Sequence, residues 1–278
     1  MWLVYALLSG LLYTASGLIT RHVLRGNKDA WAFSFYFSAI GALVSLPFFV
    51  SNPKIATTFP AWGLLSLVGI LIVGQNLLNF KATNTLEASV QGALTKFRLV
   101  WVFILSMVIL HEGFSLYKLI GTVLTVVAGI IIIQKFKKPE SLKGVIYVLA
   151  ATTLYATVII LYKYLFVSFN SVSLTFFIFF IPAVINMLIM PRAMERIGTI
   201  MKMNRWGIVA ACGLGGFANL AMNQSLAIGE ASRALVIIEA FLVTTLIGER
   251  IFLKEKSNLL IKIIAVLLAT AGAMFIRL

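Results

Sequence analysis

The feature that most constrains this chain is a succession of long apolar runs, each close to the length that a helix needs to cross a bilayer. One span takes about 20 predominantly apolar residues. Only helices and closed barrels satisfy the backbone in a bilayer, and runs this long and this continuously apolar are not barrel strands, which are about ten residues long and alternate apolar with polar residues. We therefore predict an all-α polytopic membrane protein with ten transmembrane helices, at residues 2–20, 31–50, 61–80, 87–110, 115–134, 143–165, 171–190, 206–226, 231–250 and 258–276.

The composition supports a membrane environment. Hydrophobic residues make up 61% of the chain and charged residues 12%, too few to cover a soluble domain of this size. The formal net charge of +14 could suggest nucleic acid. However, the Lys and Arg residues sit between the apolar runs, where they set orientation and meet anionic lipid. We expect a multi-pass protein of the plasma membrane whose partners are the lipid bilayer and a small-molecule substrate, with no nucleic acid.

An internal repeat divides the chain into two halves. At an offset of 143 residues, Asn76-Leu77 falls on Asn219-Leu220, and Glu87-Ala88-Ser89 falls on Glu230-Ala231-Ser232. We place the first repeat at 1–136 and the second at 137–278, with five spans in each. Because five is odd, two such halves in one chain have opposite orientations. This is the inverted repeat of many secondary transporters, in which the substrate binds near the midplane between the halves.

The repeated motifs resemble a known family. Residues 223–232, followed by an apolar run and Ile247-Gly248-Glu249-Arg250, are similar to the fourth helix of an EamA repeat, and so are residues 85–89 with the run that ends at Leu110-His111-Glu112. Over nearly its whole length the chain resembles the EamA branch of the drug/metabolite transporter superfamily. The resemblance implies ten helices, an inverted repeat and secondary transport of metabolites such as amino acids, amines or nucleotide-linked compounds.

The chain departs from this family at one place. Many relatives have a proline in the middle of the fourth helix of the repeat, where this chain has Arg98-Leu99 and Phe241-Leu242. The resemblance implies a helix break there, but neither repeat of this chain has the proline that accompanies the break in many relatives.

The orientation in the membrane is open at this point. Most Lys and Arg residues follow the first, third, fifth, seventh and ninth spans, which by the positive-inside rule places those loops in the cytoplasm and both termini outside. The family resemblance implies the reverse, with the termini inside. We favour the orientation that the charge distribution indicates, with both termini outside.

Three ionisable side chains lie inside predicted spans, namely Lys96 and Arg98 in the fourth and Glu239 in the ninth. A charge at the bilayer centre costs about 3 kcal/mol or more, so such side chains rarely face lipid. Lys96 and Glu239 are repeat equivalents, and we expect an inverted repeat to bring them to one central cavity. They either bind or couple a substrate, with Glu239 the first candidate to carry a coupling proton, or form a structural ion pair that pins the halves together.

Arg98 lies roughly 200° around a helix from Lys96, so the two side chains need not line one surface. If all three groups are ionised in one cavity, its net charge is +1. That charge favours an anionic or zwitterionic substrate, such as an amino acid or organic acid, over a free organic cation.

Polar and aromatic side chains on neighbouring spans form a second set of candidates. The amides either hydrogen-bond a polar ligand or join helices to one another. Two tyrosines, which are repeat equivalents at an offset of 142, either add aromatic walls and hydroxyl groups to the site or pack in the core. The candidates are Asn76, Asn79, Asn219, Asn223, Tyr13 and Tyr155.

Small residues recur every four positions in the fifth and tenth spans, as at Gly121, Thr125 and Gly129 and at Ala265, Ala269 and Ala273. Such faces predict close helix packing, either within one protomer or in a homodimer. The glutamates at span ends, Glu112, Glu249 and Glu255, are expected to be solvated or to belong to helix ends.

Other functional classes fit the sequence less well. An embedded enzyme is disfavoured, because Asp29 is the only aspartate, the two histidines His22 and His111 lie far apart, and no Gly-rich phosphate loop is present. We expect no metal and no cofactor. A channel or a non-transporting scaffold stays open as an alternative to a secondary transporter that works by alternating access and is driven by a gradient or by exchange, with a proton as the default coupling ion.

Overall fold

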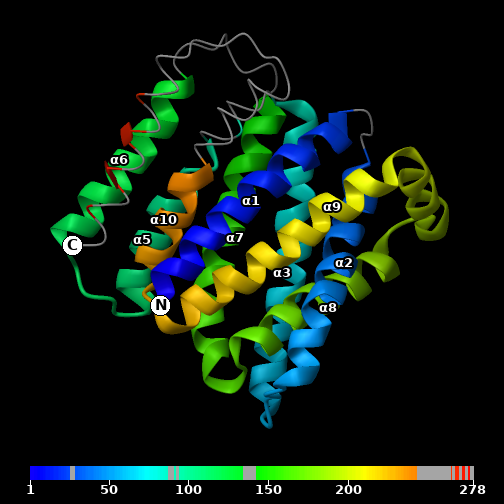
Figure 1. Cartoon of the computed structure of the whole chain (residues 1–278), viewed down its shortest axis with the longest axis horizontal. Coiled ribbons are helices and arrows are strands. Elements are labelled where there is room, and N and C mark those ends of the chain that lie inside the picture. Colours follow the sequence, from blue (N-terminus) through cyan, green and yellow to red (C-terminus); the bar gives the residue numbers. More distant parts are fainter. Residues whose placement is uncertain are drawn as a thin grey trace.

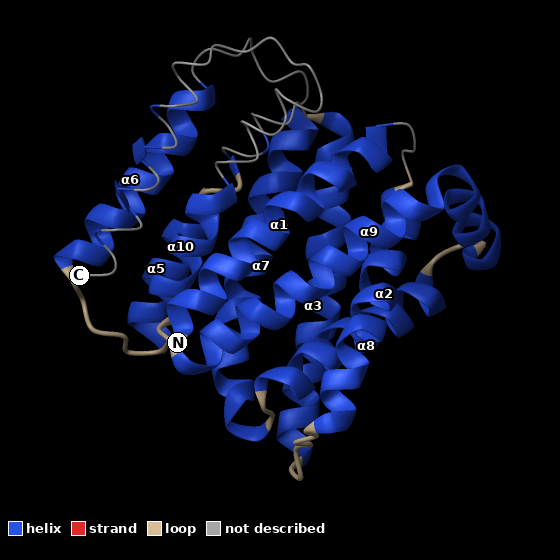
Figure 2. Ribbon diagram, viewed as in Figure 1, coloured by secondary structure: helices blue, strands red, loops and turns tan. Residues whose placement is uncertain are grey.

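The computed structural model describes residues 1–25, 29–86, 91, 94–133 and 142–242, together with 264, 267, 268, 271, 272 and 275. Every regular element within these ranges is an α-helix, and the helices form one bundle (Figures 1 and 2). They are α1 (Trp2–Arg25), α2 (Ala30–Ser51), α3 (Phe59–Thr85), α5 (Phe97–Ile109), α6 (Leu116–Ile133), α7 (Leu142–Ser168), α8 (Ser171–Ile189), α9 (Ala193–Ile228) and α10 (Ala231–Leu242).

Five of the described helices are long and apolar enough to cross a membrane, namely α1, α2, α3, α7 and α8. Shorter apolar helical stretches occupy Phe97–Ile109 and Leu116–Ala128. Large apolar side chains also cover the outside of the bundle, as at Leu43 and Leu188, which are 66% and 78% exposed. An outer surface of this kind suits lipid and not water. The described residues thus establish a multi-pass helical protein, whereas the total of ten spans stays a prediction.

The helices of the two halves pack in a reciprocal pattern. Helix α1 packs on α9 and α7 packs on α3, which is the same contact with the halves exchanged, and the contacts of α1 with α10 and of α7 with α5 form a second such pair. Ser9 Oγ donates to Ala218 O and Ser16 Oγ donates to Ala211 O, so α1 and α9 run antiparallel. The equivalent helices α2 and α8 also contact each other. This exchange is what a pseudo-twofold relation between the halves produces.

The fourth predicted span is not one continuous helix, which corrects the sequence prediction. Thr95 and Lys96 form a turn, and α5 begins only at Phe97. The amides of Arg98 and Leu99 donate to the carbonyls of Thr95 and Lys96, at 3.2 and 3.0 Å, in place of the α-helical acceptors one residue earlier. The helix is therefore interrupted near Lys96 although no proline is present.

The segment before the eighth predicted span also differs from expectation. Residues 193–203 lie between the predicted spans 171–190 and 206–226, but α9 already begins at Ala193 and is kinked at Asn204, which has φ −155° and ψ 66°. Asn204 Oδ1 accepts a hydrogen bond from Gly207 N at 3.1 Å, as an N-cap does, so the second part of α9 restarts there. Most of the tenth predicted span and all of 243–250, including Glu249, lie outside the described residues, as do Glu87-Ala88-Ser89 and Glu255.

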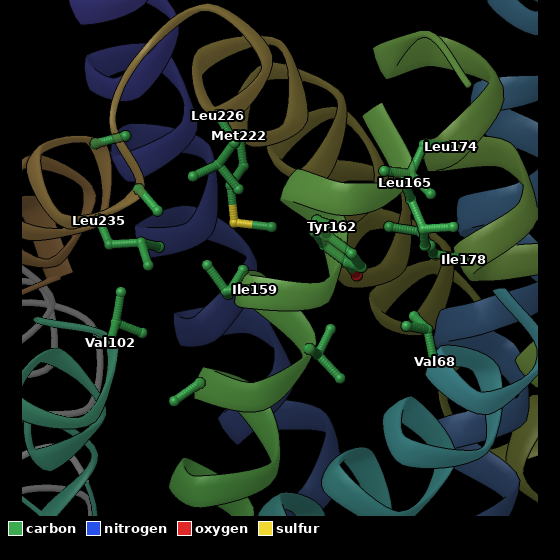
Figure 3. Packing of buried hydrophobic residues seen from close by; sticks show 14 of the residues in the cluster. Val68, Val102, Ile159, Tyr162, Leu165, Leu174, Ile178, Met222, Leu226 and Leu235 are labelled. Carbon is green, nitrogen blue, oxygen red and sulfur yellow. The ribbon is translucent and has the colours of Figure 1, made fainter. Parts of the chain in front are cut away.

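The apolar core is centred on α7, which lies between α5 and α10 on one side and α3 and α8 on the other (Figure 3). Ile159 and Leu165 of α7 are almost fully buried, and Met222 of α9 points towards Ile159. Gly216 of α9 lies so close to α2 that an added Cβ would stand 3.2 Å from the Cα of Gly41. Small residues here let two backbones approach closely.

The small-residue face of α6 packs within the chain. A Cβ added at Gly272 would lie 2.7 Å from both Gly121 O and Thr125 Oγ1, so these residues meet in one protomer. Ala265, Ala269 and Ala273 lie outside the described residues, and the homodimer stays a prediction.

Asp29 fixes the start of α2. Its carboxylate accepts hydrogen bonds from Trp31 N and Ala32 N at 3.2 and 3.0 Å, and Arg196 Nε of α9 donates to it at 2.7 Å. Burial acts to raise the pKa of Asp29, but the hydrogen bonds from Arg196, Ala32 and Trp31 outweigh it, so the pKa lies below its ordinary value. This pair joins the first half to the second.

Candidate functional site

The central ion cluster consists of Lys96, Arg98 and Glu239. Lys96 Nζ donates to Glu239 Oε2 and to the main-chain carbonyl of Glu239, both at 2.8 Å. Arg98 Nη2 forms an ion pair with Glu239 Oε1. The side chains of Lys96, Glu239 and Arg98 are 6%, 1% and 18% exposed. The structure therefore brings together all three ionisable residues that the sequence placed inside spans.

The turn at Thr95 and Lys96 explains how both cations reach one carboxylate. On a continuous helix Lys96 and Arg98 would point to opposite sides. Here Lys96 lies in the turn and Arg98 in the first turn of α5, and both side chains contact the carboxylate of Glu239. Irregular backbone at membrane depth is tolerated only where protein or a water-filled cavity surrounds it. This interruption is buried against Glu239 of α10.

Two tyrosines from different halves flank the cluster. The Arg98 guanidinium lies over the ring of Tyr155 in α7, with its carbon 4.7 Å from the ring centroid. The hydroxyl groups of Tyr155 and of Tyr13 in α1 both donate to Met222 Sδ, at 3.4 and 3.8 Å. A thioether is a weak acceptor, so these two hydroxyl groups keep most of their capacity to bind a better partner. Tyr13 and Tyr155, which are repeat equivalents, thus converge on one atom.

The four asparagines do not join this cluster through any contact between described residues. Asn223 Nδ2 donates to Thr175 Oγ1 of α8 at 2.8 Å, which joins two helices, and Asn219 Nδ2 donates to Gly215 O of its own helix at 2.9 Å. Asn79 accepts from Gln91 Nε2 through both of its oxygens, at 3.1 Å. Asn76 is buried in α3. The contacts of Asn223 and Asn79 therefore support the interhelical alternative for these two residues.

Matches to known proteins cover nearly the whole chain. The model of the EamA-like transporter family matches residues 1–134 and 142–278. The chain belongs to the EamA-like transporter family. A solved structure titled "Crystal structure of protein" has the same fold, with a TM-score of 0.77 over 99% of this chain and 95% of that chain, at 14% sequence identity. None of the curated proteins matches the chain.

Membership of the EamA family confirms the resemblance that the motifs predicted and makes the chain a membrane transporter of the drug/metabolite type. The two matched segments correspond to the two repeats. The exact boundary between residues 136 and 137 stays a prediction.

A second set of charges, the end ion cluster, was missed as a cluster by the sequence analysis. It consists of Glu112, Lys118, Glu230 and Arg233. Lys118 Nζ lies 2.9 Å from Glu230 Oε2, and Arg233 Nε lies 2.8 Å from the same oxygen. It lies where the α5–α6 connection of the first half meets the start of α10 in the second half.

Glu112 caps a helix of the other half. Its Oε1 accepts from Ala231 N at 2.9 Å and its Oε2 accepts from Ser232 Oγ at 2.6 Å, so a residue of the first EamA repeat satisfies the first turn of α10. The Glu112 side chain is only 9% exposed, so the expectation that it is solvated is wrong. The alternative, that it belongs to a helix end, agrees with these contacts. The recurrence of Glu-Ala-Ser at an offset of 143 residues was the signal that could have located this contact.

Proposed function

We propose that this EamA-family protein is a secondary active transporter that moves a small polar metabolite across the plasma membrane by alternating access. The observation that supports the proposal is the central ion cluster. It is buried between α5 of the first half and α10 of the second, so a movement of one half against the other necessarily changes its surroundings.

The charge of this cluster favours an anionic or zwitterionic substrate. Two cations face one carboxylate, and a buried excess of positive charge is stabilised by an incoming anion. Amino-acid-like molecules and organic acids meet this requirement. Tyr13 and Tyr155 would add hydroxyl groups and aromatic surface to the same site.

A proton is the coupling ion that this cluster supports best. Glu239 is the only carboxylate that the described residues contribute to this cluster, and its protonation would remove the negative charge that faces Lys96 and Arg98. The test is uptake into proteoliposomes with an imposed pH gradient. We expect the gradient to drive accumulation by the wild type and not by Glu239→Gln. Wild-type flux that is insensitive to pH would contradict proton coupling.

Counterflow in proteoliposomes tests the transport proposal as a whole. We expect saturable exchange that Lys96→Met lowers to about a tenth or less, because the substitution removes a buried partner of Glu239. Lys202→Met, at an exposed position of α9, is the matched control. A channel would conduct without counterflow, and a scaffold would show no flux. Unchanged counterflow in Lys96→Met would contradict the assigned site.

We also propose that both termini lie outside the cell, from the distribution of basic residues. A reporter fused after Leu278 and assayed on each side of the membrane tests this orientation. Activity of the reporter on the cytoplasmic side would contradict it.

A further inference from the structure

The three side chains of the central ion cluster differ in the hydrogen-bonding groups that remain available to a ligand. This inference rests on the proposed transport function and concerns the same site. Lys96 Nζ contacts two oxygens of Glu239, and both side chains are almost completely buried. Arg98 is 18% exposed, and its Nε is a buried donor without a hydrogen-bond partner among the described residues. Of the three side chains, Arg98 is therefore the most exposed, and it has a donor that no described residue accepts.

The chemistry of the two cations matches this difference. A guanidinium has five N–H donors in a planar fork that fits the two oxygens of a carboxylate, whereas an ammonium is a point charge. The ion pair with Glu239 involves Nη2 of Arg98, and no described residue accepts a hydrogen bond from Nε. The ring of Tyr155 supports one face of the guanidinium, which leaves the edges of the fork for ligands.

The charge balance restricts the ligand further. The three side chains of the cluster are two cations and one carboxylate, hence a net charge of +1. One monoanion makes the loaded site neutral, a zwitterion leaves it at +1, and a dianion brings it to −1. Because unbalanced charge is costly in a buried site, the neutral assembly is the favoured one.

We infer that Arg98 binds the carboxylate of a small organic monoanion, while Lys96 is a positioning residue that holds Glu239. Glu239 then competes with the substrate for Arg98 and sets the charge that the substrate must have. The site selects monocarboxylates over zwitterions, dicarboxylates and amines of the same size.

Four ligands with four-carbon chains separate these classes: butyrate, γ-aminobutyrate, succinate and butylamine. Inorganic phosphate is added to distinguish a carboxylate site from a general oxyanion site. Thermal shift and calorimetric titration of the full chain in detergent measure binding. We expect butyrate to bind most tightly. No shift by butyrate, or a shift as large with γ-aminobutyrate, succinate, phosphate or butylamine, would overturn the inference.

Two variants test the assigned roles. Arg98→Lys keeps the charge that Glu239 needs but loses the fork, so we expect butyrate affinity to fall by about tenfold or more with little change in the melting temperature. Arg205→Lys is the matched control, because Arg205 is exposed and also lies over an aromatic ring, that of Trp206. Equal affinity in the wild type and Arg98→Lys would overturn the role of Arg98.

Glu239→Gln gives the sharper result. It raises the net charge of the cluster from +1 to +2, so we expect the preference to change from butyrate to succinate. A merely structural role for Glu239 would lower the binding of all ligands together, and that outcome would overturn the inference. Wild-type counterflow separates the two proposals: if no ligand exchanges, the transport function fails, whereas exchange with the wrong selectivity overturns only the inference.

Discussion

The central and end ion clusters both join the two halves, but they differ in the balance of positive and negative charges and in whether a cation is left without a carboxylate of its own. In the end ion cluster two carboxylates, Glu112 and Glu230, face two cations, Lys118 and Arg233, and Glu112 also caps α10. In the central ion cluster two cations share one carboxylate, and Arg98 keeps a buried donor that no described residue accepts.

This difference separates structural polar contacts from binding groups. A network whose positive and negative charges balance in ion pairs stabilises the contact between halves and offers little to a charged ligand. An unbalanced cluster with unused donors is incomplete until something of opposite charge arrives. Exposure alone would have suggested the opposite, since Glu230 is 39% exposed and Glu239 is 1% exposed.

The largest effect is expected from Glu239→Ala. It leaves Lys96 and Arg98 buried without their anion, which costs about 3–5 kcal/mol of stability. The yield of monodisperse protein and the melting temperature in detergent measure it. Glu195→Ala, at an exposed position of α9, serves as the control. A melting temperature equal to that of the wild type would show that the central cluster contributes nothing to stability.

An intermediate effect is expected from Glu112→Ala. The first turn of α10 loses the acceptor for Ala231 N and Ser232 Oγ, which lowers the free energy of unfolding by about 1–2 kcal/mol. Lys118 keeps its ion pair with Glu230. Thermal unfolding should show the loss, and the preference for ligand charge should stay that of the wild type. A changed charge preference would contradict the separation of the two clusters.

The smallest effect is expected from Asp29→Asn. Asparagine still caps α2, so only the charge opposite Arg196 is lost, at about 1 kcal/mol or less. Because the folded-state pKa of Asp29 is lowered, its contribution is present above the ordinary value of 3.8 and disappears as the pH falls through the lowered value. Unfolding measured from pH 7 to 3 should show the difference from the wild type shrink below about pH 4. A constant difference would exclude this linkage.

Much of the fold followed from the sequence, because apolar runs and an internal repeat are local patterns. The bounds predicted for the second, seventh and sixth spans lie close to α2, α8 and α7. The meeting of Lys96 and Glu239 was expected from their equivalence in the repeat. The turn at Lys96 was not predictable from propensity, since no proline or glycine marks it and the buried ion pair depends on a distant helix.

Apolar runs and an internal repeat are enough to identify a multi-pass helical protein of two related halves with three charged residues within its spans. The partners of those charged side chains, however, depend on the tertiary structure. The turn before α5 directs both cations to Glu239, Tyr155 supports Arg98, and Glu112 reaches the start of α10 instead of solvent. The physical reason is that periodicity and hydropathy describe a helix one residue at a time, whereas pairing and unused donors depend on groups that meet only when the two halves pack together.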